Sequence, residues 1–223
     1  MKIKLFLLSF FFIIGFTLFS YSVAKERWQQ TDFNITVKLQ DHIPRKYDQI
    51  FSYFSLLGSA EVTVGICIVL AFKALLKLRW KEILGWSLIV SATLGEIFGK
   101  LVLFHPAPPQ FFHRSLLPTS LPSFYVHTDF SYPSGHMTRT IFIIVVLVNM
   151  MFFSSKDFLS KVTVICLLIA LAFLMGLTRI YLGEHWLSDV LGGFMLGVGM
   201  GFLASVLILR KDKDNIAATA LRR

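Results

Sequence analysis

The sequence predicts an all-α polytopic membrane protein, a single domain of residues 1–223 built as a bundle of six transmembrane helices. The chain is 55% hydrophobic and 16% charged, and its mean hydropathy is +0.68. A soluble domain carries about a quarter of its residues charged, so the shortfall indicates that much of the surface faces lipid. Six stretches approach the length of about 20 apolar residues that a spanning helix needs. Disorder, a fibrous protein and an ordinary soluble domain are excluded.

The first expected span, residues 5–23, has two interpretations. Lys2 and Lys4 precede it, and the small residues Ser22 and Ala24 near its end also fit a signal peptide with a cleavage site. Its apolar run is longer than the roughly 7–15 residues of a signal-peptide core. We therefore expect an uncleaved helix, which also keeps the number of spans even.

Five further apolar runs complete the bundle. They cover residues 54–75, 83–104, 137–153, 162–181 and 190–209. The third span holds Glu96 and Lys100 near its end, and charged side chains such as these are energetically costly inside a membrane. In the sixth span Gly193, Gly197 and Gly201 recur every four residues, a small-residue stripe where helices approach closely. Packing inside the bundle is the preferred interpretation of this stripe, and a homodimer face is the alternative.

Charge indicates the orientation. The chain has 22 Lys and Arg against 13 Asp and Glu, a net charge of +9. With the N-terminus inside, more of the positive residues lie on the cytoplasmic segments than on the outer ones, so both termini are expected in the cytoplasm of a bacterial inner membrane. This explains the surplus without nucleic-acid binding. Cys67 and Cys166 lie in apolar runs without ligand spacing, so we expect no disulfide, metal or cofactor.

Three polar stretches remain outside the spans. Residues 25–52 are expected to form a surface loop with at most a short interfacial helix. The proline-rich loop of residues 105–133 is unusually long, which is typical of a lid or of a segment that lines a site. The basic tail after residue 209 is expected to be a solvated topology anchor.

Polar residues that could carry chemistry cluster at the ends of spans on one side of the membrane, within residues 96–193. Ionisable groups there cost several kcal/mol unless they are paired, so each cluster is a functional hypothesis. The clusters are Glu96 with Lys100, then Pro133-Ser134-Gly135-His136, then Thr178-Arg179 with His185 and Asp189.

The spacing of the third cluster favours a nucleophile. His185 and Asp189 are four residues apart and share one helix face, so the carboxylate can accept the proton of one imidazole nitrogen and leave the other as nucleophile or base. Arg179 and Lys100 are cations suited to a phosphate group. A helix-boundary network without chemistry is the alternative for the histidine and aspartate, and an ion pair with Glu96 is the alternative for Lys100.

The second cluster favours an oxyanion site. Ser134 and Gly135 lie where the fourth span begins, and a helix start presents free N–H groups to an anion. His136 could then donate a proton to a leaving oxygen, with a capping role as its alternative.

These motifs resemble the second and third signature motifs of the type 2 phosphatidic acid phosphatase superfamily. The matching residues are Pro133-Ser134-Gly135-His136, and Arg179, His185 and Asp189 with gaps of five and three residues. That family contains integral-membrane lipid phosphatases with six spans and shares its site with vanadium haloperoxidases. The resemblance covers Lys100 to Asp189 directly and, through the number of spans, most of the chain.

The resemblance implies hydrolysis of a lipid phosphate through a phospho-histidine. His185 would attack phosphorus, Asp189 would orient it, and His136 would protonate the leaving oxygen. Lys100, Ser134, Gly135 and Arg179 would hold the phosphoryl oxygens. The substrates implied are undecaprenyl pyrophosphate, phosphatidate, phosphatidylglycerophosphate or a lipid A phosphate, reached from the outer face of the membrane. A lipid phosphotransferase using the same intermediate and a non-catalytic headgroup-binding or transport protein are the alternatives.

The chain departs from the family pattern in two places. The first motif is a Lys, six residues, then Arg-Pro, but here Ala107-Pro108 follow the six residues after Lys100. Arg114, His113 or Arg139 could supply the missing charge, and for Arg139 a structural ion pair is an equal alternative. Thr178 replaces the usual Ser and keeps the hydroxyl.

Overall fold

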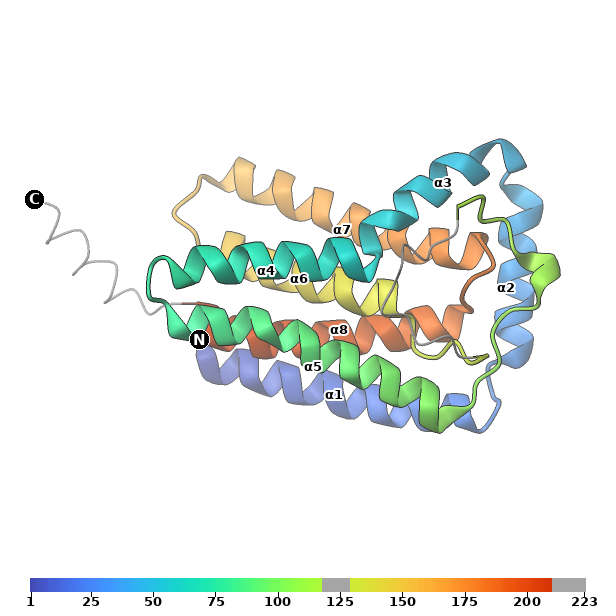
Figure 1. Ribbon diagram of the computed structural model, residues 1–223, viewed down its shortest axis with the longest axis horizontal. Coiled ribbons are helices and arrows are strands. Elements are labelled where there is room, and N and C mark those ends of the chain that lie inside the picture. Colours follow the sequence, from blue (N-terminus) through green and yellow to red (C-terminus); the bar gives the residue numbers. More distant parts are fainter. Residues whose placement is uncertain (118–128, 210–223) are drawn as a thin grey trace, which may run out of the picture.

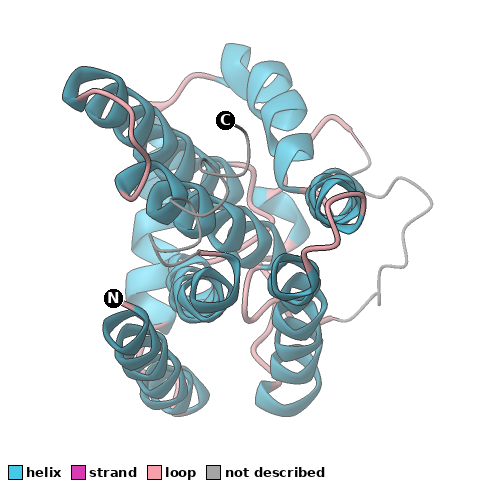
Figure 2. Cartoon of the chain, turned by 90° about the vertical axis from the view of Figure 1, so that its left-hand side faces the viewer, coloured by secondary structure: helices cyan, strands magenta, loops and turns pink. Residues whose placement is uncertain are grey.

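The computed structural model describes residues 1–117 and 129–209, and its long elements are all helices (Figure 1; Figure 2). Six helical segments are long and apolar enough to cross a membrane, which confirms the predicted all-α, six-span fold. They are α1 (Lys2–Ala24), the segment Arg45–Leu75 that ends in α4 (Ala60–Leu75), α5 (Trp80–Leu103), α6 (Gly135–Phe152), α7 (Phe158–Tyr181) and α8 (Leu187–Ile208).

The segment after α1 is helical, so the expected surface loop of residues 25–52 is wrong. It contains α2 (Gln29–His42), which lies across one end of the bundle (Figure 1), and then η1 (Arg45–Tyr47), α3 (Asp48–Ser55) and η2 (Leu56–Gly58). Ile35 and Leu39 share one face of α2 and pack against the core of the bundle. Two apolar residues one turn apart are enough to dock this helix, and its polar composition conceals them.

Helix α8 is the centre of the bundle and packs mainly against α6, α1 and α5. Its glycine stripe faces α6, as predicted for packing inside the bundle. A Cβ atom added at Gly193 would lie 2.5 Å from the Ser134 carbonyl oxygen, and one at Gly197 would lie 2.6 Å from that of Thr138. The two backbones therefore approach too closely for any larger side chain.

The two ends of the bundle differ in polarity. Helix α1 begins and α8 ends at the same end, and the loops with the motif residues lie at the opposite end beside α2 (Figure 1). Large apolar side chains are exposed along α1, α5 and α7, as expected for surfaces that contact lipid. The middle of the proline-rich loop and the basic tail lie outside the described residues.

The contact between α6 and α8 predicts a measurable cost for enlarging the stripe. Gly197→Ala would place a methyl group against the Thr138 carbonyl, and we expect the free energy of unfolding to fall by about 1–3 kcal/mol. Thermal unfolding of the purified protein in detergent measures this change. The matched control is Gly15→Ala in α1, where a Cβ meets nothing within 4 Å. An equal response of the two variants would contradict the close approach.

Candidate active site

The start of α6 is tied to both α8 and α5. Ser134 is the N-cap residue, and its Oγ accepts a hydrogen bond from the Met137 amide at 3.5 Å. Its own amide donates to the Asp189 carbonyl at 3.0 Å, which fixes the second motif against the third. A Cβ at Gly135 would overlap the carboxylate of Glu96, so only glycine fits there while that carboxylate lies against the helix start.

His185 and Asp189 form a buried pair at the start of α8. The His185 Nδ1 and the Asp189 Oδ2 are 3.3 Å apart, and the same oxygen accepts the Trp186 amide at 2.9 Å. The chain turns sharply before His185, and Gly183 adopts φ +68° in this turn, a conformation that favours glycine. Because Nδ1 faces the carboxylate, Nε2 is the nitrogen that remains for chemistry.

Three cations lie in the same end of the bundle, and each has a carboxylate partner. Lys100 Nζ is 2.9 Å from Glu96 Oε1, and Arg139 forms an ion pair with the other oxygen of Glu96. Arg179 forms an ion pair with Glu184 and donates a hydrogen bond to Ser55, whose hydroxyl is also buried. The three cationic residues are 5%, 3% and 1% exposed, respectively, so carboxylates rather than water compensate their charges.

The cations act on His185. Burial, and then the positive charges of Arg179, Lys100 and Arg139, hold the pKa of His185 well below its ordinary value. The imidazole is therefore neutral at neutral pH, which is the form that a nucleophile needs. The buried Nε2 of His136 has no hydrogen-bond partner among the described residues.

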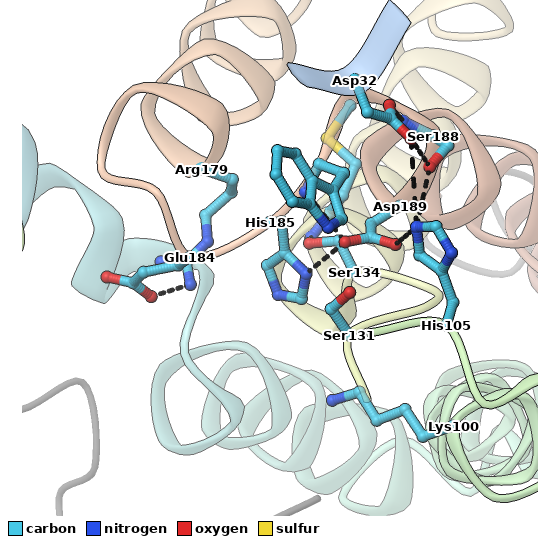
Figure 3. A network of polar contacts seen from close by, with 12 residues as sticks. Asp32, Lys100, His105, Ser131, Ser134, Arg179, Glu184, His185, Ser188 and Asp189 are labelled. Carbon is cyan, nitrogen blue, oxygen red and sulfur yellow. Dashed lines mark hydrogen bonds and ion pairs between the residues drawn. The ribbon is translucent and has the colours of Figure 1, made fainter. Parts of the chain in front are cut away.

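The structure thus brings most of the predicted residues to one end of the bundle (Figure 3). Those brought together are Lys100, Ser134, Gly135, His136, Arg139, Arg179, His185 and Asp189.

The remaining candidates have structural partners instead. Arg114 donates to the carbonyls of Gln40 and Ile43 and to the Tyr181 hydroxyl, at 3.0, 3.3 and 3.2 Å. These contacts do not support Arg114 as the substitute for the missing arginine. The Thr178 hydroxyl donates to the Met175 carbonyl of its own helix at 2.8 Å.

Several partners of the site had no place in the sequence-based prediction. Glu184 and Ser55 hold Arg179, and a further group of Asp32, His105 and Ser188 lies behind Asp189 (Figure 3). His105 is the first residue of the proline-rich loop and belongs to none of the motifs. Glu184 precedes His185 directly, and a charged residue so close to a buried motif was the one available signal.

Comparison with known proteins connects this site to characterised sequences. Residues 80–213 match the model of the PAP2 superfamily. Over 78 residues the chain is 40% identical to phosphatidylglycerophosphatase B of Bacillus subtilis, covering 34% of this chain and 38% of that protein. Over 153 residues it is 30% identical to an undecaprenyl-diphosphatase of Sulfolobus acidocaldarius, covering 68% and 66%. The matches therefore span less than two thirds of the length of these curated relatives.

Two solved structures share the fold. A transmembrane PAP2-type phosphatidylglycerolphosphate phosphatase of Bacillus subtilis superposes with a TM-score of 0.71 and 21% identity, covering 88% of this chain and 94% of that one. Aquifex aeolicus LpxE superposes with a TM-score of 0.54 and 24% identity, covering 78% and 94%.

The lowered pKa of His185 predicts its behaviour during titration. On lowering the pH, the imidazole should stay neutral through pH 6.5, its ordinary pKa, and take up a proton only in more acidic solution. Ring nitrogen and carbon shifts of histidine-labelled protein in detergent, assigned with His185→Gln, measure this. A short unfolded peptide that contains one histidine, in the same detergent solution, serves as the reference, since an ordinary histidine has a pKa of about 6.5. Protonation of His185 together with this peptide would contradict the cation cluster.

Proposed function

The chain belongs to the PAP2 superfamily, and on that premise we propose that this integral membrane protein is a lipid phosphatase acting through a phospho-histidine. The observation that carries the proposal is the buried His185–Asp189 pair, in which one imidazole nitrogen faces the carboxylate and the positive charges of three cations act on the ring. A neutral nucleophile surrounded by fixed positive charge is suited to attack on an anionic phosphoryl group.

The first step transfers the phosphoryl group to the enzyme. His185 Nε2 attacks phosphorus, an N–P bond forms, and the P–O bond to the lipid breaks. Asp189 holds the proton on Nδ1 and stabilises the positive charge that the ring acquires. His136 gives its proton to the departing oxygen.

The second step returns the enzyme to its starting state. His136 enters the first step as the imidazolium, beside the bound phosphoryl anion, and is neutral after it has protonated the leaving oxygen. In the second step the neutral His136 takes a proton from a water molecule, whose oxygen attacks phosphorus and breaks the N–P bond. Inorganic phosphate leaves, and His185 and His136 regain their original protonation states. The amides at the start of α6 and the cations stabilise the charge of the phosphoryl oxygens in both transition states.

Arg139 takes the role of the arginine that Ala107 replaces. It lies one turn into α6 from Gly135, and helical side chains lean toward the helix start, where Glu96 holds its guanidinium. Glu96 also holds Lys100, so both cations are fixed relative to the backbone amides of Gly135. Ala107 itself lies on the segment after α5, with its amide bonded to the Asp129 carbonyl at 3.1 Å.

The substrate is a lipid whose phosphate or diphosphate reaches the polar end of the bundle laterally. The relatives act on phosphatidylglycerophosphate and undecaprenyl diphosphate by name, and we propose the same headgroup classes here, with phosphatidate and lipid A phosphates as further members of the test panel. With both termini cytoplasmic, the site lies at the outer face of a bacterial cytoplasmic membrane.

The proposal predicts phosphate release that depends on His185. Purified protein in detergent micelles should release inorganic phosphate from at least one lipid in this panel, and His185→Ala should lower kcat by about a thousandfold or more. His42→Ala, at an exposed residue of α2, is the matched control and should be neutral. If the wild-type protein is as inactive as the variant on every lipid, the proposal that this protein is an enzyme is overturned. A phosphorylated acceptor without matching free phosphate would favour the phosphotransferase.

The role proposed for Arg139 predicts that an arginine introduced at position 107 restores activity to a variant that lacks Arg139. Removing Arg139 leaves Glu96 paired with Lys100, so the single variant Arg139→Met is the test. We expect kcat to fall by about a hundredfold, because one phosphate donor is lost. Adding Ala107→Arg to this variant should recover much of the rate, whereas Ala107→Arg in the wild type should change it little. A large gain in the wild type would show that Arg139 does not fill the position.

A further inference from the structure

Behind the catalytic pair, on the side of Asp189 away from His185, lies a buried histidine that belongs to none of the motifs (Figure 3). His105 Nε2 is 3.7 Å from Asp189 Oδ1, 3.9 Å from Asp32 Oδ2 and 3.4 Å from the Ser188 hydroxyl oxygen. Each of these residues is less than 10% exposed, and Asp189 and Ser188 are fully buried. One imidazole nitrogen therefore faces three oxygen atoms from α2 and α8.

The hydrogen bonds around His105 determine which nitrogen carries its proton. The Ser188 hydroxyl donates to Asp32 Oδ2 at 2.7 Å, and the Ser188 amide donates to Asp32 Oδ1 at 2.8 Å. The hydroxyl can then only accept from His105. Because all three oxygens that face Nε2 are acceptors, Nε2 carries the proton.

The backbone holds His105 in this position independently of its ring. The His105 carbonyl accepts the Ser131 amide at 3.0 Å, and Pro106 forms an antiparallel bridge with Phe130. The Pro106 carbonyl accepts the indole N–H of Trp186 at 2.8 Å. The segment after α5 is thereby fastened to the residue that follows His185.

One oxygen of the Asp189 carboxylate, Oδ1, is placed to interact with His105. Asp189 Oδ2 accepts from His185 and from the Trp186 amide, whereas no hydrogen bond reaches Oδ1 among the described residues. A carboxylate that is held at one oxygen can still rotate, and His105 Nε2 faces Oδ1 at 3.7 Å. Ser131 also lies beside Asp189 (Figure 3) and is the competing donor.

We propose that His105 is a positioning residue for the phosphatase reaction: its Nε2–H, held by Asp32 and Ser188, fixes the Asp189 carboxylate and thereby keeps the Nδ1–H tautomer of His185. The inference rests on the proposed function, because it acts through the nucleophile and its partner. It extends the site to a chain of four side chains, which are Asp32 on α2, His105, Asp189 on α8 and His185.

The test compares side chains that differ in where they place a donor. A Gln amide nitrogen reaches approximately the position of Nε2, an Asn amide nitrogen does not, and Ala has no donor. We expect His105→Ala and His105→Asn to lower kcat by about 10- to 100-fold with KM changed less than about threefold. His105→Gln should retain kcat within about threefold of the wild type. His42→Ala is the control for the loss of an exposed histidine, and Ser131→Ala tests the competing donor.

A second measurement does not depend on turnover. Ring nitrogen shifts of labelled His185 report its tautomer, and the wild type should show the Nδ1–H form. His105→Ala should produce a mixture of tautomers, while His105→Gln should not. Thermal unfolding of each variant in detergent separates loss of the fold from loss of position.

The outcomes are distinguishable. An unchanged kcat and tautomer in His105→Ala, or an effect found only in Ser131→Ala, would overturn the inference while leaving the proposed function intact. Equal losses in the Gln and Asn variants, in step with a lowered unfolding temperature, would show that His105 only supports the fold. Wild-type protein without phosphatase activity would refute the proposed function, and the tautomer of His185 would still decide the role of His105.

Discussion

Charged side chains buried at one end of an apolar bundle must be paired, and this requirement shapes the rest of the site. Glu96 joins α5 to α6 because it compensates both Lys100 and Arg139. On the other side Glu184 compensates Arg179. A membrane-embedded site cannot rely on water to screen such charges, so the acidic residues position the cations as well as neutralise them. The chemistry depends on this scaffold before any substrate arrives.

The six-span fold could be predicted from the sequence because helices that face lipid must be apolar, which leaves a strong signal in the composition. Long apolar runs and scarce charge predict six spans directly, and the glycines of α8 predict close packing inside the bundle, which the structure shows against α6. Helix α2 was missed for the opposite reason. It is polar, and only Ile35 and Leu39 show that one face docks on the core. The composition of a polar helix indicates that much of its surface is polar, but it does not show which residues contact the rest of the protein.

Local spacing predicted the part of the site that lies close together in the sequence. The four-residue gap between His185 and Asp189 predicts a contact through a shared helix face. The contact is present, with His185 Nδ1 3.3 Å from Asp189 Oδ2, but the shared face is wrong because His185 precedes α8 and reaches the carboxylate across the helix start. The partners behind them could not be predicted this way. Asp32 and Ser188 form hydrogen bonds although they are 156 residues apart in the sequence, and no local sequence pattern near either residue predicts that contact. Long-range hydrogen bonds between single polar residues depend on how the helices pack, which spacing does not encode.

The carboxylate partners of the cations also affect how tightly a free anion is held. Glu184 and Glu96 are tethered to the protein, so they compete for the cations at a high effective concentration that does not change with dilution. A lipid phosphate overcomes this competition because its hydrocarbon tail adds binding energy that does not come from the headgroup. Inorganic phosphate has no tail. The site is therefore expected to retain inorganic phosphate weakly, which limits inhibition by the released product.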